Sequence, residues 1–154
     1  MGVGEVRAFF RDRGLDYDIR ELGESTETVE LAARALGVEP ALIAKTLAFR
    51  MDDTGIIVVV RGDARIDTKK FKQAFRTKPR MLSPEEVLAM TGHPVGGVCP
   101  FGLKQPMDVF LDTNLRPFAV VYPAAGSPNS HIEITPDDLC AVTGGRWVDV
   151  CRDG

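Results

Sequence analysis

Apolar residues recur along this chain with two different periods, and each period predicts one kind of secondary structure. Helical spacing or helix-start chemistry occurs in residues 3–14, 26–36, 40–44, 67–75, 83–92 and in a short segment that begins at residue 135. Strand character occurs in residues 17–21, 46–51, 55–61, 107–111, 117–122, 131–134 and 146–150. The pattern therefore predicts helices and strands mixed along the whole chain.

The strongest strand signal is a predicted hairpin. Residues 56–60 are apolar throughout, which favours a central strand buried on both faces. Asp52-Asp53-Thr54-Gly55 supplies turn residues between this strand and the one before it. Helices and strands do not alternate regularly, so we predict an α+β fold rather than a doubly wound parallel one. The expected architecture is a single domain over residues 1–154 with a mixed, largely antiparallel sheet surrounded by helices.

Bulk composition excludes several classes of protein. The chain has 154 residues, 44% of them hydrophobic and 27% charged, which suits one packed domain rather than a disordered chain. Residues 1–11 contain charged side chains and do not resemble a signal peptide. The longest apolar run, residues 56–60, is too short to cross a bilayer, so no membrane association is expected.

Cysteine and histidine usage gives little support for a metal centre. The three cysteines form no CxxC pair, and their odd number argues against a disulfide framework, so a reducing cytoplasm is the predicted location. His93 and His131 have no partner at the spacing of a metal motif. We therefore expect neither a metal nor a cofactor.

Two features remain as candidates for chemistry. Residues 92–106 form a long glycine- and proline-rich segment, in which glycines free the backbone to direct N–H groups at an oxygen; the alternative is a surface crossover that needs tight turns. Lys45 is predicted on the same strand face as Leu47 and Phe49. Burying an unpaired ammonium is costly, so Lys45 either serves a function or extends to solvent.

Charge is distributed unevenly. The formal net charge is −3, yet residues 61–80 hold eight basic residues against Asp63 and Asp67. The basic residues are Arg61, Arg65, Lys69, Lys70, Lys72, Arg76, Lys78 and Arg80. Such a segment is often a solvated helix face, but its contrast with the rest of the chain favours a polyanion docking there.

Three short motifs, in this order, carry a family resemblance. They are Ala44-Lys45-Thr46-Leu47, then Gly96-Gly97-Val98-Cys99-Pro100-Phe101-Gly102, then Ala125-Gly126-Ser127 before His131-Ile132-Glu133-Ile134. Together they resemble the YbaK/EbsC family, which is similar to the editing domain inserted in bacterial prolyl-tRNA synthetases. Each motif alone is loose, and their joint order and spacing make the resemblance specific.

The resemblance implies a trans-editing deacylase that hydrolyses the ester of mischarged tRNA, typically tRNA(Pro) carrying a small wrong amino acid such as alanine or cysteine. It implies that the acceptor end of mischarged tRNA is the partner, with prolyl-tRNA synthetase as a second one. The implied catalytic residues are Lys45, Gly96, Gly97 and Pro100. The implied substrate-binding residues are Thr46, Phe101, Gly102, Gly126, Ser127 and His131. The predicted tRNA-binding residues are Arg61, Arg65, Lys69, Lys70, Lys72 and Arg76.

An aminoacyl ester is already activated, so editing needs no strong nucleophile. A 10⁴-fold acceleration requires roughly 5.5 kcal/mol, and two backbone donors of roughly 3 kcal/mol each would supply most of it. We hypothesise that the N–H groups of Gly96 and Gly97 stabilise the oxyanion, while Lys45 holds the terminal phosphate or the ester carbonyl.

Two other functions remain open at this stage. One is a nucleic-acid-binding regulator on the same fold that has lost the chemistry. The other is a thiol enzyme that uses Cys99. The amino acid removed, the preferred tRNA and the oligomeric state do not follow from the sequence, because a pocket that differs by one methylene discriminates by only about 1–3 kcal/mol.

Overall fold

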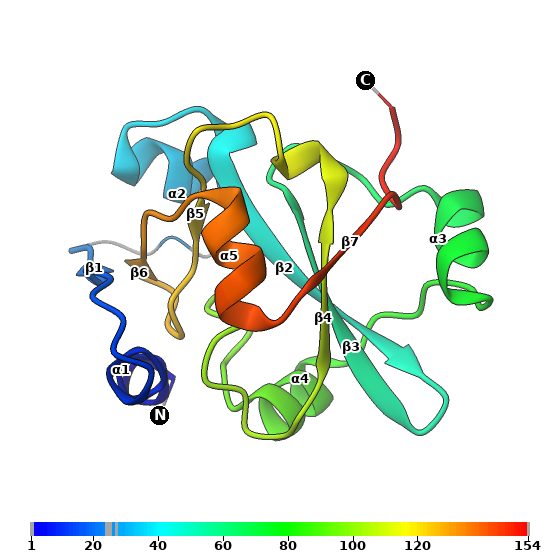
Figure 1. The fold of residues 1–154 in the computed structure, drawn as a ribbon, viewed down its shortest axis with the longest axis horizontal. Coiled ribbons are helices and arrows are strands. Elements are labelled where there is room, and N and C mark those ends of the chain that lie inside the picture. Colours follow the sequence, from blue (N-terminus) through cyan, green and yellow to red (C-terminus); the bar gives the residue numbers. More distant parts are fainter. Residues whose placement is uncertain (1, 24–25, 27, 154) are drawn as a thin grey trace.

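The computed structural model describes residues 2–23, 26 and 28–153, in which helices surround a five-stranded sheet of order β5-β2-β3-β4-β7 (Figure 1). The helices are α1 (Val3–Asp12), α2 (Val29–Leu36), α3 (Thr68–Phe75), α4 (Pro84–Thr91) and α5 (Pro136–Thr143). The strands are β1 (Arg20–Glu21), β2 (Ile43–Met51), β3 (Thr54–Arg61), β4 (Asp108–Asp112), β5 (Tyr122–Pro123), β6 (Ser130–His131) and β7 (Arg146–Val148). Short 3-10 turns span Pro40–Leu42 and Thr113–Leu115.

The predicted hairpin is the centre of the sheet. Met51 pairs with Thr54 across a two-residue turn, and Asp52 adopts the left-handed backbone conformation (φ 50°) that such a turn requires. β3 is buried on both faces from residue 55 to residue 60, as its continuous apolar run predicts. The hairpin prediction is therefore confirmed.

The α+β class and the mixed sheet are confirmed, but the sheet is less antiparallel than predicted. Only the β2–β3 pairing is antiparallel within the five-stranded sheet, whereas β5 with β2, β3 with β4 and β4 with β7 are parallel. A hairpin makes its two strands antiparallel, but the direction of a strand that joins after a long connection depends on where that connection crosses the sheet. The separate pair β1–β6 is antiparallel.

Helix boundaries follow the predicted chemistry closely. Ser83 caps α4 in a complete capping box with Glu86, and Gly92 ends that helix in the left-handed conformation. Asp67 caps α3 as predicted. The helix predicted from residue 26 begins at Val29, with Thr28 as N-cap, and residue 27 lies outside the described residues.

Several predicted segments are shorter than expected, among them the strands over 17–21 and 146–150, which are reduced to β1 and β7. The helical turn that starts at Pro40 ends at Leu42, because β2 begins at Ile43. The strand expected over 117–122 is reduced to β5, and the one expected over 131–134 to β6. Proline cannot donate to a strand ladder, so residues 117–123, with a proline at each end, form isolated bridges such as Val121 with Ile134 instead of a long strand.

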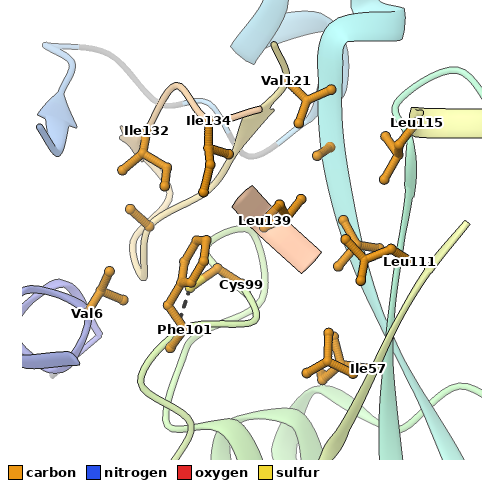
Figure 2. Packing of buried hydrophobic residues seen from close by; sticks show 14 of the residues in the cluster. Val6, Ile57, Cys99, Phe101, Leu111, Leu115, Val121, Ile132, Ile134 and Leu139 are labelled. Carbon is orange, nitrogen blue, oxygen red and sulfur yellow. Dashed lines mark hydrogen bonds between the residues drawn. The ribbon is translucent and has the colours of Figure 1, made fainter. Parts of the chain in front are cut away.

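The two faces of the sheet carry separate hydrophobic clusters. We call them the α1 face and the α3 face. Buried residues of the α1 face include Val6, Phe10, Ala44, Ala48, Ile57, Val59, Cys99, Phe101, Leu111 and Leu139. Buried residues of the α3 face include Phe49, Val58, Val60, Ala64, Phe71, Val150 and Cys151. Figure 2 shows the cluster of the α1 face, in which Val6, Phe101 and Leu139 converge from α1, the glycine-rich loop (residues 92–106) and α5.

Phe71 provides a test of the α3 face. Its side chain is fully buried, and its ring centroid lies 4.9 Å from Phe49 and 4.7 Å from Phe75. We expect Phe71→Ala to lower the free energy of unfolding by about 3–5 kcal/mol, because it removes a buried ring and leaves a cavity. Chemical denaturation of the variant measures this, and a loss below about 1 kcal/mol would contradict the packing described.

None of the described helices is long and apolar enough to span a membrane.

Candidate active site

A cavity of about 360 Å³ opens at the free edge of β2. β5 pairs with β2 at Ile43 and Ala44, and residues 80–82 pair with it around Phe49, so none of the described strands covers the edge between them. The lining residues come from α2, β2, the start of α4, the glycine-rich loop and β6. They are Thr26, Thr28, Val29, Ala32, Ile43, Ala44, Lys45, Thr46, Leu47, Ala48, Met81, Leu82, Pro84, Val87, Val95, Gly96, Val98, Ala124 and His131.

The strand backbone itself forms part of the cavity wall. Five consecutive residues of β2, 44–48, line the cavity, although successive side chains of a strand point to opposite faces. A run without gaps therefore means that the strand edge faces the cavity. The hydroxyl Oγ1 of Thr46 is buried there and bonds to no group of the described chain.

Lys45 lies on the same face as Leu47 and Phe49, as predicted, but its ammonium does not face the glycine-rich loop. Nζ donates a hydrogen bond of 2.7 Å to the carbonyl of Ala64, a buried residue of the α3 face. Burial lowers the pKa of Lys45 below its ordinary value; the Cys151 side chain opposes this shift and Arg65 adds to it. Lys45 and Gly96 line one cavity, whereas the Lys45 ammonium is bonded to Ala64 on the α3 face.

The glycine-rich loop begins with a tight turn over residues 94–97. The Gly97 N–H closes this turn by donating to the Pro94 carbonyl at 2.9 Å, and Gly96 has a φ of 93°, which favours glycine at the third position. The Gly97 N–H is therefore already bonded, which corrects the hypothesis that it stabilises an oxyanion. The Gly96 N–H has no protein acceptor among the described residues, and Gly96 lines the cavity.

Gly97 instead allows two loops to touch. A Cβ atom at Gly97 would lie 2.6 Å from the Ser127 backbone, and the Gly97 carbonyl accepts a hydrogen bond from the Gly126 N–H at 3.1 Å. Gly126 has a φ of 101°, and a Cβ there would lie 2.5 Å from Gly2. Gly97, Gly126 and Ser127 thus lie outside the cavity lining and hold the glycine-rich loop against residues 125–130.

Three further predicted residues lie behind the cavity wall rather than in it. Phe101 is fully buried against Phe9 and Phe10 of α1, and a Cβ at Gly102 would lie 2.7 Å from the Glu5 carbonyl. Pro100 is buried beside them and is absent from the lining. Their sequence motif marks the loop correctly, but in this structure these residues pack the loop against α1.

A buried polar cluster locks the same loop. His93 Nε2 lies 2.6 Å from the Phe101 carbonyl, and the Cys99 thiol contacts both groups at 3.6 Å (Figure 2 shows the contact between Cys99 and Phe101). Burial raises the pKa of Cys99 to about 12, so the thiol stays protonated at neutral pH. Since the thiolate is the nucleophilic form, Cys99 is a packed side chain and not a reactive cysteine.

His131 lines the cavity from β6. It is 2% exposed, and its Nδ1 lies 3.5 Å from the hydroxyl of Thr26, which donates to the Pro128 carbonyl. Burial lowers the pKa of His131 to about 4, so its imidazole is neutral at pH 7. A neutral ring can donate one hydrogen bond and accept another without adding charge to the site.

This pKa predicts how stability depends on pH. An unfolded chain takes up the His131 proton near pH 6.5 and the folded protein only near pH 4, so the free energy of unfolding falls as the pH drops between these values. The full loss is about 3 kcal/mol, and His93, whose pKa burial also lowers, adds to it. Urea unfolding at pH 7 and pH 5.5 checks this, and His131→Gln should show a smaller difference. An equal difference in both proteins would contradict the assignment.

The basic segment begins beside β2, a strand that lines the cavity, but none of residues 61–80 is itself in the lining. Arg61 pairs with Ala44 across the hairpin, and Ala64, which binds Lys45, immediately precedes Arg65. α3 then carries Lys69, Lys70 and Lys72, and Arg76 ends it in the left-handed conformation. Lys70 is already bonded to Asp149 at 3.1 Å and Asp153 at 2.8 Å, and these bonds raise its pKa. Arg61 likewise contacts Asp63.

Sequence reasoning missed most of the apolar lining of the cavity. Ala44, Ala48, Val98 and Ala124 are small or medium-sized residues that read as ordinary core positions. One signal could have located the cavity. Met81 and Val95 are large apolar residues in predicted loops, they line the cavity, and they are 62% and 57% exposed.

Comparison with known proteins places these features in a family. The model of the aminoacyl-tRNA editing domain matches residues 23–142. The chain is 48% identical over 155 residues to YwhH, an uncharacterized protein of Bacillus subtilis, with 99% of both chains covered. It is 29% identical over 125 residues to EbsC of Enterococcus faecalis, a candidate Cys-tRNA(Pro)/Cys-tRNA(Cys) deacylase, covering 80% of this chain and 76% of that protein.

Larger proteins and solved structures give the same result. A proline–tRNA ligase of Bacillus licheniformis is 28% identical over 127 residues, which span 79% of this chain and 22% of the ligase. The crystal structure of a candidate trans-editing enzyme for prolyl-tRNA synthetase superposes with a TM-score of 0.91 at 32% identity, covering 98% of this chain and 97% of that one. The similarity therefore covers nearly the whole fold.

Proposed function

The chain belongs to the aminoacyl-tRNA editing domain family, and from this premise we propose that it is a trans-acting deacylase that hydrolyses mischarged tRNA. We further propose that residues 1–154 act as one editing domain in the cytoplasm, and that the substrate is tRNA(Pro) esterified with a small amino acid such as alanine or cysteine. The similarity to EbsC and to proline–tRNA ligases supports this choice of substrate. It also supports prolyl-tRNA synthetase as the partner whose errors are corrected.

One observation carries the proposal: a single small cavity brings together an apolar wall, unpaired backbone donors and Lys45. Ala44, Ala48 and Ala124 leave room for a small side chain. The Gly96 N–H and the free edge of β2 provide donors for an ester carbonyl. Such an arrangement suits hydrolysis of an activated ester by water, because fixed donors stabilise the developing oxyanion without a strong nucleophile.

Lys45 and the basic segment would bind the tRNA itself. The Lys45 ammonium is bonded to Ala64, within the basic segment, so a phosphate of the terminal nucleotide placed there would replace the Ala64 carbonyl as its partner. An ammonium with a lowered pKa gains more from a phosphate than from a neutral carbonyl, because a nearby opposite charge restores the charged form. The acceptor stem would then extend along α3.

The charge of α3 predicts a salt-sensitive effect on binding. Reversal of Lys69, Lys70 and Lys72 should weaken tRNA binding, and Lys69→Glu with Lys72→Glu is the cleaner pair because Asp149 and Asp153 already neutralise Lys70. Each lost phosphate contact should reduce the slope of log K against log salt by about one unit. Filter binding at several salt concentrations measures this, with Lys104→Glu as a matched control. An unchanged slope would place the acceptor stem elsewhere.

Deacylation is tested with a panel of mischarged tRNAs. The pure protein is given alanyl-, cysteinyl-, seryl- and threonyl-tRNA, and release of the amino acid is followed over time. Hydrolysis of alanyl- or cysteinyl-tRNA(Pro), with prolyl-tRNA(Pro) spared, is the expected result. Failure to release any amino acid while tRNA still binds tightly in a single-turnover assay would favour the alternative, a regulator that kept the fold and lost the chemistry.

A further inference from the structure

The edge of β2 is open at one residue. Ala44 is paired with Pro123 of β5, and the Ala48 carbonyl accepts a hydrogen bond from the Leu82 N–H at 3.0 Å. Thr46 lies between these two positions, and on the side away from β3 none of the described residues pairs with it. We call this gap at Thr46 the edge notch.

The direction of the Thr46 backbone follows from the hairpin register. Met51 and Thr54 close the two-residue turn, so the odd-numbered residues of β2 direct their N–H and C=O groups to β3. The even-numbered residues direct theirs away from β3, as the bonds of Ala48 with Leu82 and of Arg50 with Arg80 show. The N–H and C=O of Thr46 therefore face the cavity, and no described group bonds to them.

The length of the edge notch limits what can occupy it. From Ala44 to Ala48 the strand rises about 13 Å, and both ends are already paired. A peptide strand that added to the sheet would need several free residues in a row. Among the described residues, the free groups on this stretch of edge are the N–H and C=O of Thr46 and the N–H of Ala48. The notch thus fits a ligand with one donor and one carbonyl close together, which is the pattern of a single aminoacyl group.

The charges around the notch define its ligand further. None of the described residues that line the cavity is a carboxylate, and His131 is neutral. The Lys45 ammonium is bonded to Ala64 and leaves the Thr46 carbonyl free. A carbonyl that faces a cavity without a protein partner is stabilised most by a charged donor.

On the basis of the proposed function, we infer that the Thr46 carbonyl binds the α-ammonium of the aminoacyl group, so that the cavity selects esters with a free α-amino group. N-acylated aminoacyl-tRNA, including peptidyl-tRNA, cannot present an ammonium there and adds bulk at a closed notch. The enzyme would therefore spare such esters while hydrolysing free aminoacyl esters.

Non-hydrolysable adenosine amides test this inference by binding alone. The probes are 3′-amino-3′-deoxyadenosine acylated with alanine, with N-acetylalanine, and with propionic acid, which lacks the amine but adds no bulk. We expect the alanyl amide to bind at least about tenfold more tightly than either of the others, as for the loss of a charge-assisted hydrogen bond. Calorimetric titration gives the dissociation constants.

The Thr46→Val variant distinguishes binding of the amine by the backbone carbonyl from binding by the side-chain hydroxyl. The variant keeps the carbonyl and removes Oγ1, so the preference for alanyl over propionyl amide should persist; its loss would show that the hydroxyl reads the amine and would overturn the inference. Equal binding of the alanyl and propionyl amides to the wild-type protein, or binding of neither, would also overturn it. Amine-dependent binding without hydrolysis of any aminoacyl-tRNA would count against the proposed function alone.

Discussion

Replacement of Lys45 by methionine is expected to lower deacylation of alanyl- or cysteinyl-tRNA(Pro) by at least about 100-fold while the fold is retained. Methionine preserves most of the apolar stem of this side chain and removes the ammonium. The loss follows if that charge positions the terminal phosphate or the ester. Single-turnover hydrolysis, with the protein in excess over the mischarged tRNA and above their dissociation constant, measures the effect on the chemical step.

Stability should change much less than activity in this variant. The hydrogen bond from Nζ to the Ala64 carbonyl is lost, which costs about 1 kcal/mol. Thermal unfolding checks this, and Lys104→Ala, an exposed lysine outside the cavity, is the matched control that should keep full turnover. Wild-type turnover by Lys45→Met would remove Lys45 from the site.

Replacement of Gly97 by alanine is expected to damage the site through the fold rather than through a lost donor. The new Cβ would lie 2.6 Å from three backbone atoms of Ser127, so the two loops would have to separate. Such overpacking costs about 3 kcal/mol, and the hydrogen bond from the Gly126 N–H to the Gly97 carbonyl would weaken. Turnover should fall more than tRNA affinity, because α3 is remote from this contact.

A matched control is available in α1. A Cβ at Gly4 would have no atom within 4 Å, so Gly4→Ala should leave stability unchanged or raise it by up to about 1 kcal/mol. Thermal unfolding of both variants compares the two sites directly. A Gly97→Ala protein as stable and as active as the wild type would show that the loops are not held together as described.

Local chemistry was readable from the sequence because it depends on neighbours in the chain. The capping box at Ser83, the cap at Asp67 and the hairpin turn predicted within residues 52–55 each need only a few consecutive residues. The two caps and the hairpin are confirmed, with the turn narrowed to residues 52–53. The buried central strand was also predictable, since a continuous apolar run has few other solutions. The family followed from three motifs whose order is preserved along the chain.

The opposite holds for Lys45 and the glycine-rich loop. The sequence placed Lys45 correctly on the face of Leu47 and Phe49, but only the folded chain brings the Ala64 carbonyl to its ammonium. From the motif around Gly96 and Gly97 we predict two equivalent backbone N–H donors. The turn closed by Gly97 uses one of them, so Gly96 and the edge of β2 remain for the substrate.

The sequence by itself therefore determined the elements, their caps, the central hairpin and the family, because these depend on short-range periodicity and on motif order. The tertiary structure decided which backbone groups stay unpaired, which glycines are contacts between loops, and that three pairings of the five-stranded sheet are parallel. The physical reason is that hydrogen-bond pairing between distant segments depends on register and on crossing connections, which no local pattern records. The cavity at Thr46 exists because two distant segments stop short of the same strand edge.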